Sequence, residues 1–274
     1  MMERRGTVSV IVICYNEERN LPRCLASLAW ADEIIVVDSF STDRTVEIAE
    51  RSGARTLRHA YDGDIRQRER GFASATGEWF LYVDADEEVT PGLAEEIRAV
   101  TGRPDSRDGY EVPRRVKAFG KWIMHGGWYP DYTLRLFRRG RYTAVTEEVH
   151  GGFRVNGEAG RLTGLLNHYT YDTIGQYLGK MNDYTSLQIS ALLREPERSR
   201  KPLGKILFSP PAHFLRKYFG LGGYRDGMPG FLLAVLGAIY TLALYAKLWE
   251  YRYRQGRGEP LPPVTNVELG AFRR

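Results

Sequence analysis

The stretch Glu78-Trp-Phe-Leu-Tyr-Val-Asp84-Ala-Asp86-Glu-Glu88 decides the fold of this chain. Residues 78–83 are rich in aromatic and β-branched side chains and predict a buried strand. Asp84 and Asp86 follow where that strand must end. Ligands of open α/β sheets bind outside the carboxyl ends of the strands, and hard cations such as Mg²⁺ or Mn²⁺ prefer oxygen ligands. The stretch therefore predicts a ligand site, although three residues alone leave a solvated acidic loop open as the alternative.

The residues before this stretch alternate between strand and helix patterns. The apolar run of residues 7–13 is typical of a parallel strand that is covered on both faces. We expect Gly71 to break the last helix before residue 78 and Gly77 to end it. The expected elements, in order, are strand 7–13, a helix through 21–28, strand 33–37, a helix over 46–49 capped by Ser41 or Thr42, strand 55–58, helix 65–76, strand 78–83 and a helix opened by Pro91.

This alternation with short turns predicts an α/β fold with a doubly wound, mostly parallel sheet. Three polar positions then fall at the carboxyl ends of three strands, namely Asn16, Asp38 and the Asp84/Asp86 pair. Their convergence strengthens the prediction of a site at this edge of the sheet.

The bulk composition describes a globular protein. The chain has 274 residues, of which 43% are hydrophobic and 27% charged, with a net charge of +5. Cys14 and Cys24 have no zinc-site spacing, and the sequence runs from Met1 into a strand without a secretory pattern. We therefore expect reduced, buried cysteines in a cytosolic compartment.

The pattern of predicted elements changes after about residue 109. Strands of antiparallel or mixed type are expected at 110–119, 132–137 and 141–145. A glycine- and aromatic-rich loop, residues 125–131, lies between the first two. Residues 173–193 predict an amphipathic helix.

The last third combines basic and apolar residues. Residues 198–217 contain six Lys or Arg and no acid, which suits an anionic membrane surface but also a basic helix packed on the core. Residues 227–246 carry no charge, but their strongly apolar part, 231–246, is shorter than the about 20 residues of a typical span. A helix lying in or re-entering the membrane fits best, and a buried hairpin or a single span stays open.

Three motifs together resemble glycosyltransferase family 2: residues 8–18 (VSVIVICYNEE), 36–45 (VVDSFSTDRT) and 75–86 (ATGEWFLYVDAD). The resemblance implies a GT-A fold, a Rossmann-like mostly parallel sheet, and inverting transfer from a nucleotide-diphosphate sugar. Residues 122–139 and 222–227 further resemble lipopolysaccharide inner-core glucosyltransferases of the WaaE type.

The resemblance also implies a donor site. Tyr15 would stack on the nucleobase and Asp38 would accept from its ring N–H, while a core aromatic is the alternative for Tyr15. Arg68 or Arg70 would approach the diphosphate, unless they belong to a solvated helix face. The implied donor-binding set is Tyr15, Asn16, Glu17, Asp38, Arg68, Arg70 and Asp84.

A divalent cation, Mg²⁺ or Mn²⁺, is the implied cofactor. Asp86 would bind it directly, Asp84 would lie near the ribose or the metal, and His150 would be a further ligand or a structural histidine. The cation would neutralise charge on the departing UDP.

Inversion needs a general base for the acceptor hydroxyl. Asp131 is the first candidate, although Pro130 stands where relatives often have glutamate. Glu147 and Glu148 compete for the role, because Gly151 stands where relatives often have a further acid.

These inferences predict a catalytic domain at 1–195, with a nucleotide-sugar half at 1–105 and an acceptor half at 106–195, and a membrane-associating helical region and tail at 196–274. The expected enzyme moves a hexose, glucose from a UDP-sugar, onto a lipid-linked saccharide such as lipopolysaccharide core. It would be peripheral or monotopic on the cytoplasmic face of the bacterial inner membrane. The alternatives are a polyisoprenyl-phosphate glycosyltransferase and a non-catalytic saccharide-binding protein. Nucleic acid is not expected as a partner despite the pI of 9.1, because the basic residues accompany apolar ones.

Overall fold

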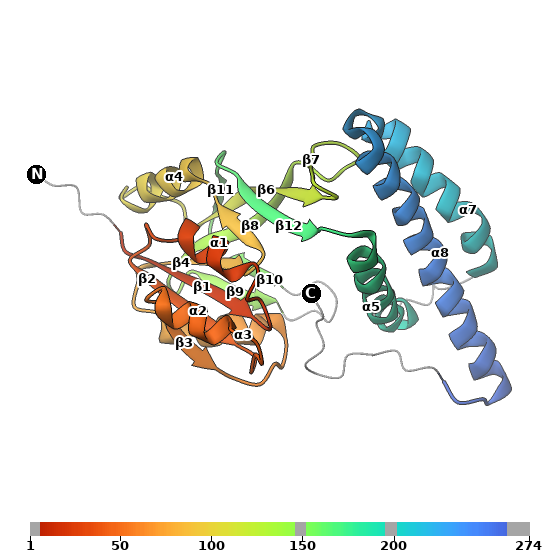
Figure 1. The fold of residues 1–274 in the computed structure, drawn as a ribbon, viewed down its shortest axis with the longest axis horizontal. Coiled ribbons are helices and arrows are strands. Elements are labelled where there is room, and N and C mark those ends of the chain that lie inside the picture. The colour runs from red at the N-terminus through yellow and green to blue at the C-terminus, as the bar shows by residue number, and fades with distance from the viewer. Residues whose placement is uncertain (1–5, 146–151, 195–201, 262–274) are drawn as a thin grey trace, which may run out of the picture. The chain divides into compact units, whose positions relative to one another are not determined.

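A computed structural model describes residues 6–145, 152–194 and 202–261 of the chain (Figure 1). The chain forms two compact units. The first comprises Met1–Arg115 and Pro130–Thr170, and the second comprises Val116–Tyr129 and Tyr171–Arg274.

The first unit is built on a sheet whose strands follow the order β3-β2-β1-β4-β8-β6-β12-β5. The four strands β3 to β4 in this order are mutually parallel, and β8 joins β4 in antiparallel register. The strands on this path are β1 (Val8–Cys14), β2 (Glu33–Asp38), β3 (Arg55–Arg58), β4 (Trp79–Asp84), β5 (Glu87–Val89), β6 (Gly109–Ala118), β8 (Asp131–Arg138) and β12 (Leu166–Tyr171). This sheet, with its helices, confirms the predicted α/β class.

Shorter strands complete the sheets. Both β7 (Lys121–Ile123) and β11 (Ala159–Arg161) pair with β6, whereas β9 (Tyr142–Val145) and β10 (Gly152–Val155) form a separate antiparallel pair. The strands predicted at 110–119, 132–137 and 141–145 are thereby confirmed as β6, β8 and β9.

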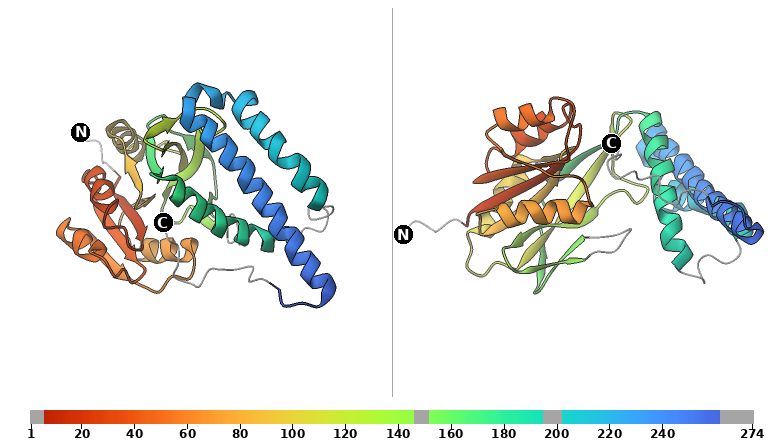
Figure 2. Two further views of the ribbon diagram at one scale, coloured as in Figure 1. Left: turned by 45° about the vertical axis from the view of Figure 1, so that its right-hand side comes forward. Right: turned by 90° about the horizontal axis from the view of Figure 1, so that it is seen from below.

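Helices cover both faces of the parallel sheet (Figure 2). They are α1 (Leu21–Ser27), α2 (Thr45–Arg51), α3 (Asp64–Ser74) and α4 (Pro91–Thr101). Alternate side chains of β1 enter two different hydrophobic cores. Val8, Val10 and Val12 pack in a core with α1, α2 and α4, whereas Ile11 and Ile13 pack in a core with α3. This double burial explains why the β1 sequence is continuously apolar.

The prediction that Gly71 breaks the third helix is wrong. The α3 helix runs without interruption through Gly71 and ends at Ser74, before the extended residue Ala75. A Cβ atom at Gly71 would lie 2.5 Å from Cγ2 of Ile11. The glycine therefore lets α3 approach β1 closely, and a single glycine costs a helix only about 1 kcal/mol.

The second unit is mainly helical. It contains α5 (Ile174–Arg194), which confirms the helix predicted at 173–193, and a hairpin of α7 (Pro202–Leu215) and α8 (Gly227–Arg257). The π-helical turn η1 (Arg216–Gly220) and the 3₁₀ turn η2 (Gly223–Asp226) join the two arms. Residues Gly223–Arg257 are long and apolar enough to cross a membrane by length and composition. The helix therefore extends well beyond the apolar run at 231–246.

Candidate active site

The loops that follow β1 and β2 are held together by side chains. Asn16 adopts a left-handed conformation (φ 54°), which asparagine tolerates better than most residues. Its Oδ1 accepts from Thr42 N at 2.8 Å, and its own N donates to Ser41 Oγ at 2.9 Å. Buried Glu17 accepts from Asn20 Nδ2 at 2.9 Å. Asn16 and Glu17 thus shape the loop that carries the half-buried Tyr15.

Asp38 ends β2 and is completely buried. Both of its carboxylate oxygens accept from Ser41 N, at 3.2 and 3.1 Å. The half-exposed Arg58 lies 3.5 Å from Oδ2 and supplies a counter-charge. A buried carboxylate requires such partners. The nucleobase role of Asp38 and Tyr15 stays a prediction.

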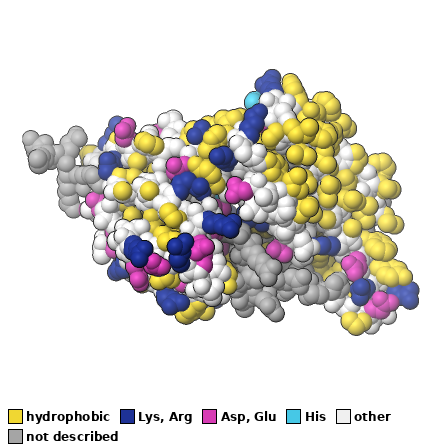
Figure 3. All heavy atoms as spheres, viewed as in Figure 1, with side chains coloured by type: hydrophobic (Ala, Val, Ile, Leu, Met, Phe, Trp, Pro, Cys, Tyr) yellow, Lys and Arg dark blue, Asp and Glu magenta, His cyan; other side chains and the backbone are white. Residues whose placement is uncertain are grey.

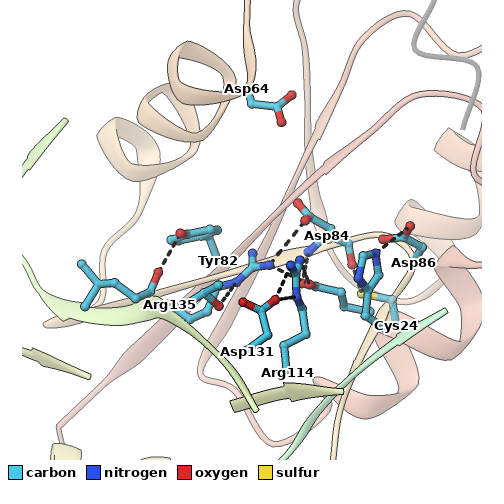
Figure 4. A network of polar contacts seen from close by, with 12 residues as sticks. Cys24, Asp64, Tyr82, Asp84, Asp86, Arg114, Asp131 and Arg135 are labelled. Carbon is cyan, nitrogen blue, oxygen red and sulfur yellow. Dashed lines mark hydrogen bonds and ion pairs between the residues drawn. The ribbon is translucent and has the colours of Figure 1, made fainter. Parts of the chain in front are cut away.

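Asp84 lies between two buried arginines that come from different elements (Figure 4). Arg68 of α3 donates from Nη2 to Asp84 Oδ1 at 2.7 Å, and Arg135 of β8 lies 3.5 Å from Oδ2. Both guanidinium groups also lie over the ring of Tyr82, at 4.9 and 4.7 Å. Burial acts to lower the pKa of Arg68, but nearby Asp84 and Asp64 outweigh it and raise that pKa.

Glu87 holds both Asp84 and Arg135 in place through hydrogen bonds. It is completely buried, and its Oε2 accepts from Asp84 N at 2.9 Å. Its Oε1 accepts from Arg135 Nη2 at 2.6 Å and lies 3.6 Å from Arg114 Nη1. The charge of this buried carboxylate is therefore balanced by two guanidinium groups, as burial demands.

Asp86 turns away from the arginines and meets His168. The distance between Asp86 Oδ2 and His168 Nε2 is 3.3 Å, and both side chains are largely buried. Antiparallel pairing places His168 of β12 opposite Glu87 of β5, and Tyr169 N donates to the backbone oxygen of Asp86 at 2.9 Å. The carboxylate of Asp86 and the imidazole of His168 thus lie side by side at the end of β4.

These two groups form the part of the site that suits a cation. Within the described ranges, no group of three or more His, Cys, Asp or Glu side chains could hold a metal ion. Mg²⁺ and Mn²⁺ nevertheless often take only one or two protein ligands and fill the other positions with water and substrate phosphates. Asp86 and His168 would supply two protein ligands and fit that mode of binding.

Asp131 begins β8 directly opposite Arg114 of β6. Arg114 donates to Asp131 Oδ2 from Nε at 3.0 Å and from Nη2 at 2.6 Å. The Asp131 side chain keeps 39% of its surface exposed, so it is both oriented and accessible. It shares one face of its strand with Arg135, because alternate residues of a strand point the same way.

The remaining predicted residues are Arg70, Glu147, Glu148 and His150, of which the structure describes only Arg70. Arg70 lies on α3, but its guanidinium binds Asp62 at 2.5 and 2.6 Å. Three further candidates, Glu147, Glu148 and His150, lie outside the described residues.

Four residues of the site were missed by the sequence reasoning, namely Glu87, Arg114, Arg135 and His168. Glu87 looked like part of a solvated acidic turn. Arg135 alternates with apolar residues on a predicted strand, and this alternation is a signal that could have indicated its face. Arg114 is followed directly by Arg115 and shows no such alternation. His168 carries no local signal, because 82 positions separate it from Asp86.

The fold and these contacts define an α/β enzyme whose polar groups converge at the carboxyl ends of parallel strands. A family model described as glycosyl transferase family 2 matches residues 9–155. The chain belongs to this family and is a glycosyltransferase, which confirms the resemblance and its GT-A fold class.

Similar proteins with curated descriptions include the lipopolysaccharide core biosynthesis glycosyltransferase LpsC of Rhizobium meliloti (strain 1021). It is 32% identical over 251 residues, which cover 89% of this chain and 92% of that protein. A glycosyltransferase of Rickettsia typhi (strain ATCC VR-144 / Wilmington) is 27% identical over 258 residues, which cover 89% of this chain and 87% of that protein.

Solved structures are also similar to this chain. Mycobacterium tuberculosis glucosyl-3-phosphoglycerate synthase in complex with Mn²⁺, UDP-glucose and phosphoglyceric acid is 25% identical, with a TM-score of 0.36 over 40% of this chain and 44% of that chain. S. aureus TarS 1-349 in complex with UDP-GlcNAc is 17% identical, with a TM-score of 0.46 over 91% of this chain and 92% of that chain.

Proposed function

We propose that this protein is an inverting glycosyltransferase that moves glucose from UDP-glucose onto a lipid-linked saccharide such as lipopolysaccharide core. It would act on the cytoplasmic face of the bacterial inner membrane. The observation that carries the proposal is the strand end of β4, where Asp84 meets two buried arginines and Asp86 meets His168. This arrangement offers cationic groups and metal-binding oxygen and nitrogen atoms side by side, as a sugar diphosphate requires.

Asp86 and His168 are the proposed ligands of a divalent cation, Mg²⁺ or Mn²⁺. Imidazole and carboxylate groups both bind such ions, and His168 lies beside Asp86. His150 remains a further candidate ligand. When bound, the cation would neutralise negative charge that develops on the departing diphosphate. Asp84 is proposed to orient Arg68 and Arg135 and to lie near the ribose.

Arg68 is the arginine proposed to contact the diphosphate. Its guanidinium is held by Asp84 and Asp64, which leaves the planar group fixed in one orientation. A fixed guanidinium loses less conformational entropy when it binds phosphate oxygens. Arg70 is not proposed for this role, because it is engaged by Asp62.

Asp131 is the proposed general base. It would take the proton of the acceptor hydroxyl as that oxygen attacks the anomeric carbon and the bond to the nucleotide diphosphate breaks. The two hydrogen bonds from Arg114 hold the carboxylate on Oδ2 and leave Oδ1 to face the acceptor. Glu147 and Glu148 remain the alternatives for this step.

The nature of the acceptor rests on the relative from Rhizobium meliloti, whose described role is in lipopolysaccharide core biosynthesis and which aligns along 89% of this chain. That likeness favours a saccharide acceptor over polyisoprenyl phosphate. A non-catalytic saccharide-binding protein would have no need of the accessible, oriented carboxylate of Asp131.

Thermal unfolding with a panel of UDP- and GDP-sugars tests the donor, because a ligand that binds only the folded state raises its stability. UDP-glucose with Mn²⁺ or Mg²⁺ should give the largest rise in Tm, and chelation of the metal should reduce it. Preference for a GDP-sugar would overturn the donor assignment. Transfer of labelled glucose to polyisoprenyl phosphate but not to core saccharide would overturn the acceptor assignment.

A further inference from the structure

The outer face of α7 is apolar along its whole length. Its most exposed large side chains recur about every four residues, the spacing of one helix face. They are Leu203, Leu207, Phe208 and Leu215, with exposures of 62%, 68%, 74% and 55%. The stripe continues into η1 at Phe219, which is also exposed.

A second apolar stripe runs along α8. Its exposed members are again separated by three or four residues or by multiples of a helical turn: Met228, Phe231, Ile239, Leu242, Trp249 and Tyr253. Figure 3 shows hydrophobic side chains gathered over α7 and α8 on the face that is in view. Soluble monomers rarely expose so continuous an apolar surface, which marks an interaction site.

The two helices pack as an antiparallel hairpin. Phe214 of α7 contacts Phe231 of α8 with ring centroids 6.0 Å apart, and Lys205 lies 5.2 Å from the ring centroid of Tyr245. Lys205, near the start of α7, thus lies beside Tyr245 in the later part of α8, as expected for antiparallel helices. Phe231 packs on α7 at one edge of the α8 stripe and stays 38% exposed, and the other exposed members of both stripes stay available.

The flank of α8 that faces α5 includes a polar contact at Lys247, in contrast to the stripes. Lys247 Nζ donates to the backbone oxygen and Oδ1 of Asn182 at 2.8 Å and to Thr185 Oγ1 and Ser186 Oγ at 2.9 Å. An ammonium group with these partners is not compatible with a helix that is surrounded by lipid on all sides. Only one side of the hairpin is therefore suited to hydrocarbon.

The turn of the hairpin is basic. Arg216, Lys217 and Arg225 lie in η1 and η2, and among the described residues no carboxylate is within ion-pair distance of them. The nearby carboxylate of Asp226 is already engaged, by Met124 N at 3.0 Å and by His125 N at 2.8 Å. Burial and the neighbouring Arg216 lower the pKa of Lys217, as expected of a cation that lacks a local anion. The turn is therefore suited to bind phosphate groups.

We propose that the α7–α8 hairpin lies flat in the surface of a bilayer that contains anionic lipid, with both apolar stripes in the acyl boundary and the turn on lipid phosphates. Basic charge next to an apolar face is complementary to such a surface. This orientation deepens the proposed membrane location and does not depend on the donor or the acceptor.

A spanning arrangement does not fit the hairpin. The 31 residues of α8 are about 46 Å long, but the 14 residues of α7 reach only about 21 Å, less than the about 30 Å of a hydrocarbon core. If α8 crossed the bilayer, the described α7 helix would be too short to cross beside it. Lying in the interface buries the outer stripes of both helices and leaves α5 in water.

Flotation of the full chain with vesicles tests the proposal. Binding should be strong to phosphatidylcholine vesicles that contain phosphatidylglycerol, weak to phosphatidylcholine alone, and reduced by salt. Arg216→Gln and Arg225→Gln should each weaken binding about fivefold. Arg51→Gln is the matched control, because it removes the same charge from an exposed position on α2 and should have no effect. Equal binding to neutral vesicles would show that the basic turn does not select anionic lipid and would overturn its assigned role.

The apolar stripe is tested with Phe208→Glu and, at a second position on the same face, Leu203→Glu. Each should reduce vesicle binding by at least tenfold while the Tm of the protein stays within a few degrees. Leu178→Glu, at an exposed apolar position on α5, is the control and should bind normally. Loss of binding by the control together with normal binding by the α7 variants would overturn the assignment of the surface.

Thiol labelling distinguishes the flat orientation from a span. Cys14 and Cys24 are buried, so Tyr224→Cys and Gln255→Cys each add an accessible thiol near one end of α8. With protein added to preformed vesicles, a membrane-impermeant thiol reagent outside should label both variants. Protection of one end until the vesicles are opened by detergent would show a span and contradict the proposal.

Discussion

Arg68 Nη2 lies 2.7 Å from Asp84 Oδ1, and both side chains are buried. This pair joins the helix after β3 to the carboxyl end of β4, which the sequence separates by 16 positions. A buried ion pair is sensitive to the loss of either partner, because the remaining charge stays buried without compensation. The pair is therefore both a structural link and a fixed cation at the strand end.

Replacement of Arg68 by alanine should destabilise the protein and weaken UDP-glucose binding. Loss of one partner from a buried pair costs about 3–5 kcal/mol. Arg70→Ala, on the same helix, removes a partly exposed pair with Asp62 and should cost less than about 1 kcal/mol with little change in donor affinity. Urea unfolding and calorimetric titration measure the two quantities. Equal effects of the two variants would contradict the assignment of Arg68.

Asp131→Asn should lower kcat by about 10²- to 10⁴-fold, the usual contribution of a general base. Donor affinity should be unchanged, since Asp131 is not part of the Asp84 and Asp86 contacts. Asparagine can still accept from Arg114, so the local fold is kept. Full residual turnover would move the role of the base to Glu147 or Glu148.

Glu33 should make stability depend on pH in the acid range. Burial acts to raise its pKa, but hydrogen bonds from Ser9 and Thr76 and the charge of Arg55 outweigh it, so that the pKa is lowered. A lowered pKa in the folded state stabilises the protein at pH values above the unfolded pKa of about 4.3, and this stabilisation is lost as pH falls through the folded pKa.

The matching variant is Glu33→Gln. Its free energy of unfolding should be lower than that of the wild type by about 1 kcal/mol at pH 7, and the difference should shrink below pH 4. Urea denaturation of both proteins at the two pH values measures it. If the difference in free energy of unfolding stayed constant with pH, the charge of Glu33 would not contribute to stability.

The parallel half of the fold could be predicted because its strands are buried on both faces and therefore read as apolar runs. Residues 8–14 and 79–84 are buried at every position. Helix ends and the strands β5, β7, β10, β11 and β12 were harder to find, since these strands are short or partly exposed, and β5, β11 and β12 have partners far away in the chain. Gly71 was misread because its role is set by Ile11 and not by the helix itself.

The location of the site at the strand ends could be predicted from the sequence, but the contacts between its side chains could not. Asp84 and Asp86 were expected to act together, yet their side chains meet different partners, two arginines and a histidine. Charge alone could not identify Glu87 as buried, because its burial depends on Arg135. His168 reaches Asp86 only through the antiparallel pairing of β12 with β5.

Mn²⁺ binding by Asp86 and His168 is the central claim, and titration of the cation followed by electron paramagnetic resonance tests it most directly. With UDP present, the wild type should bind one Mn²⁺, and Asp86→Ala and His168→Ala should each weaken binding by at least about tenfold. His125→Ala removes a similar histidine, 3.2 Å from Asp226, and should bind Mn²⁺ like the wild type. Unchanged Mn²⁺ affinity in both Asp86→Ala and His168→Ala would contradict the account.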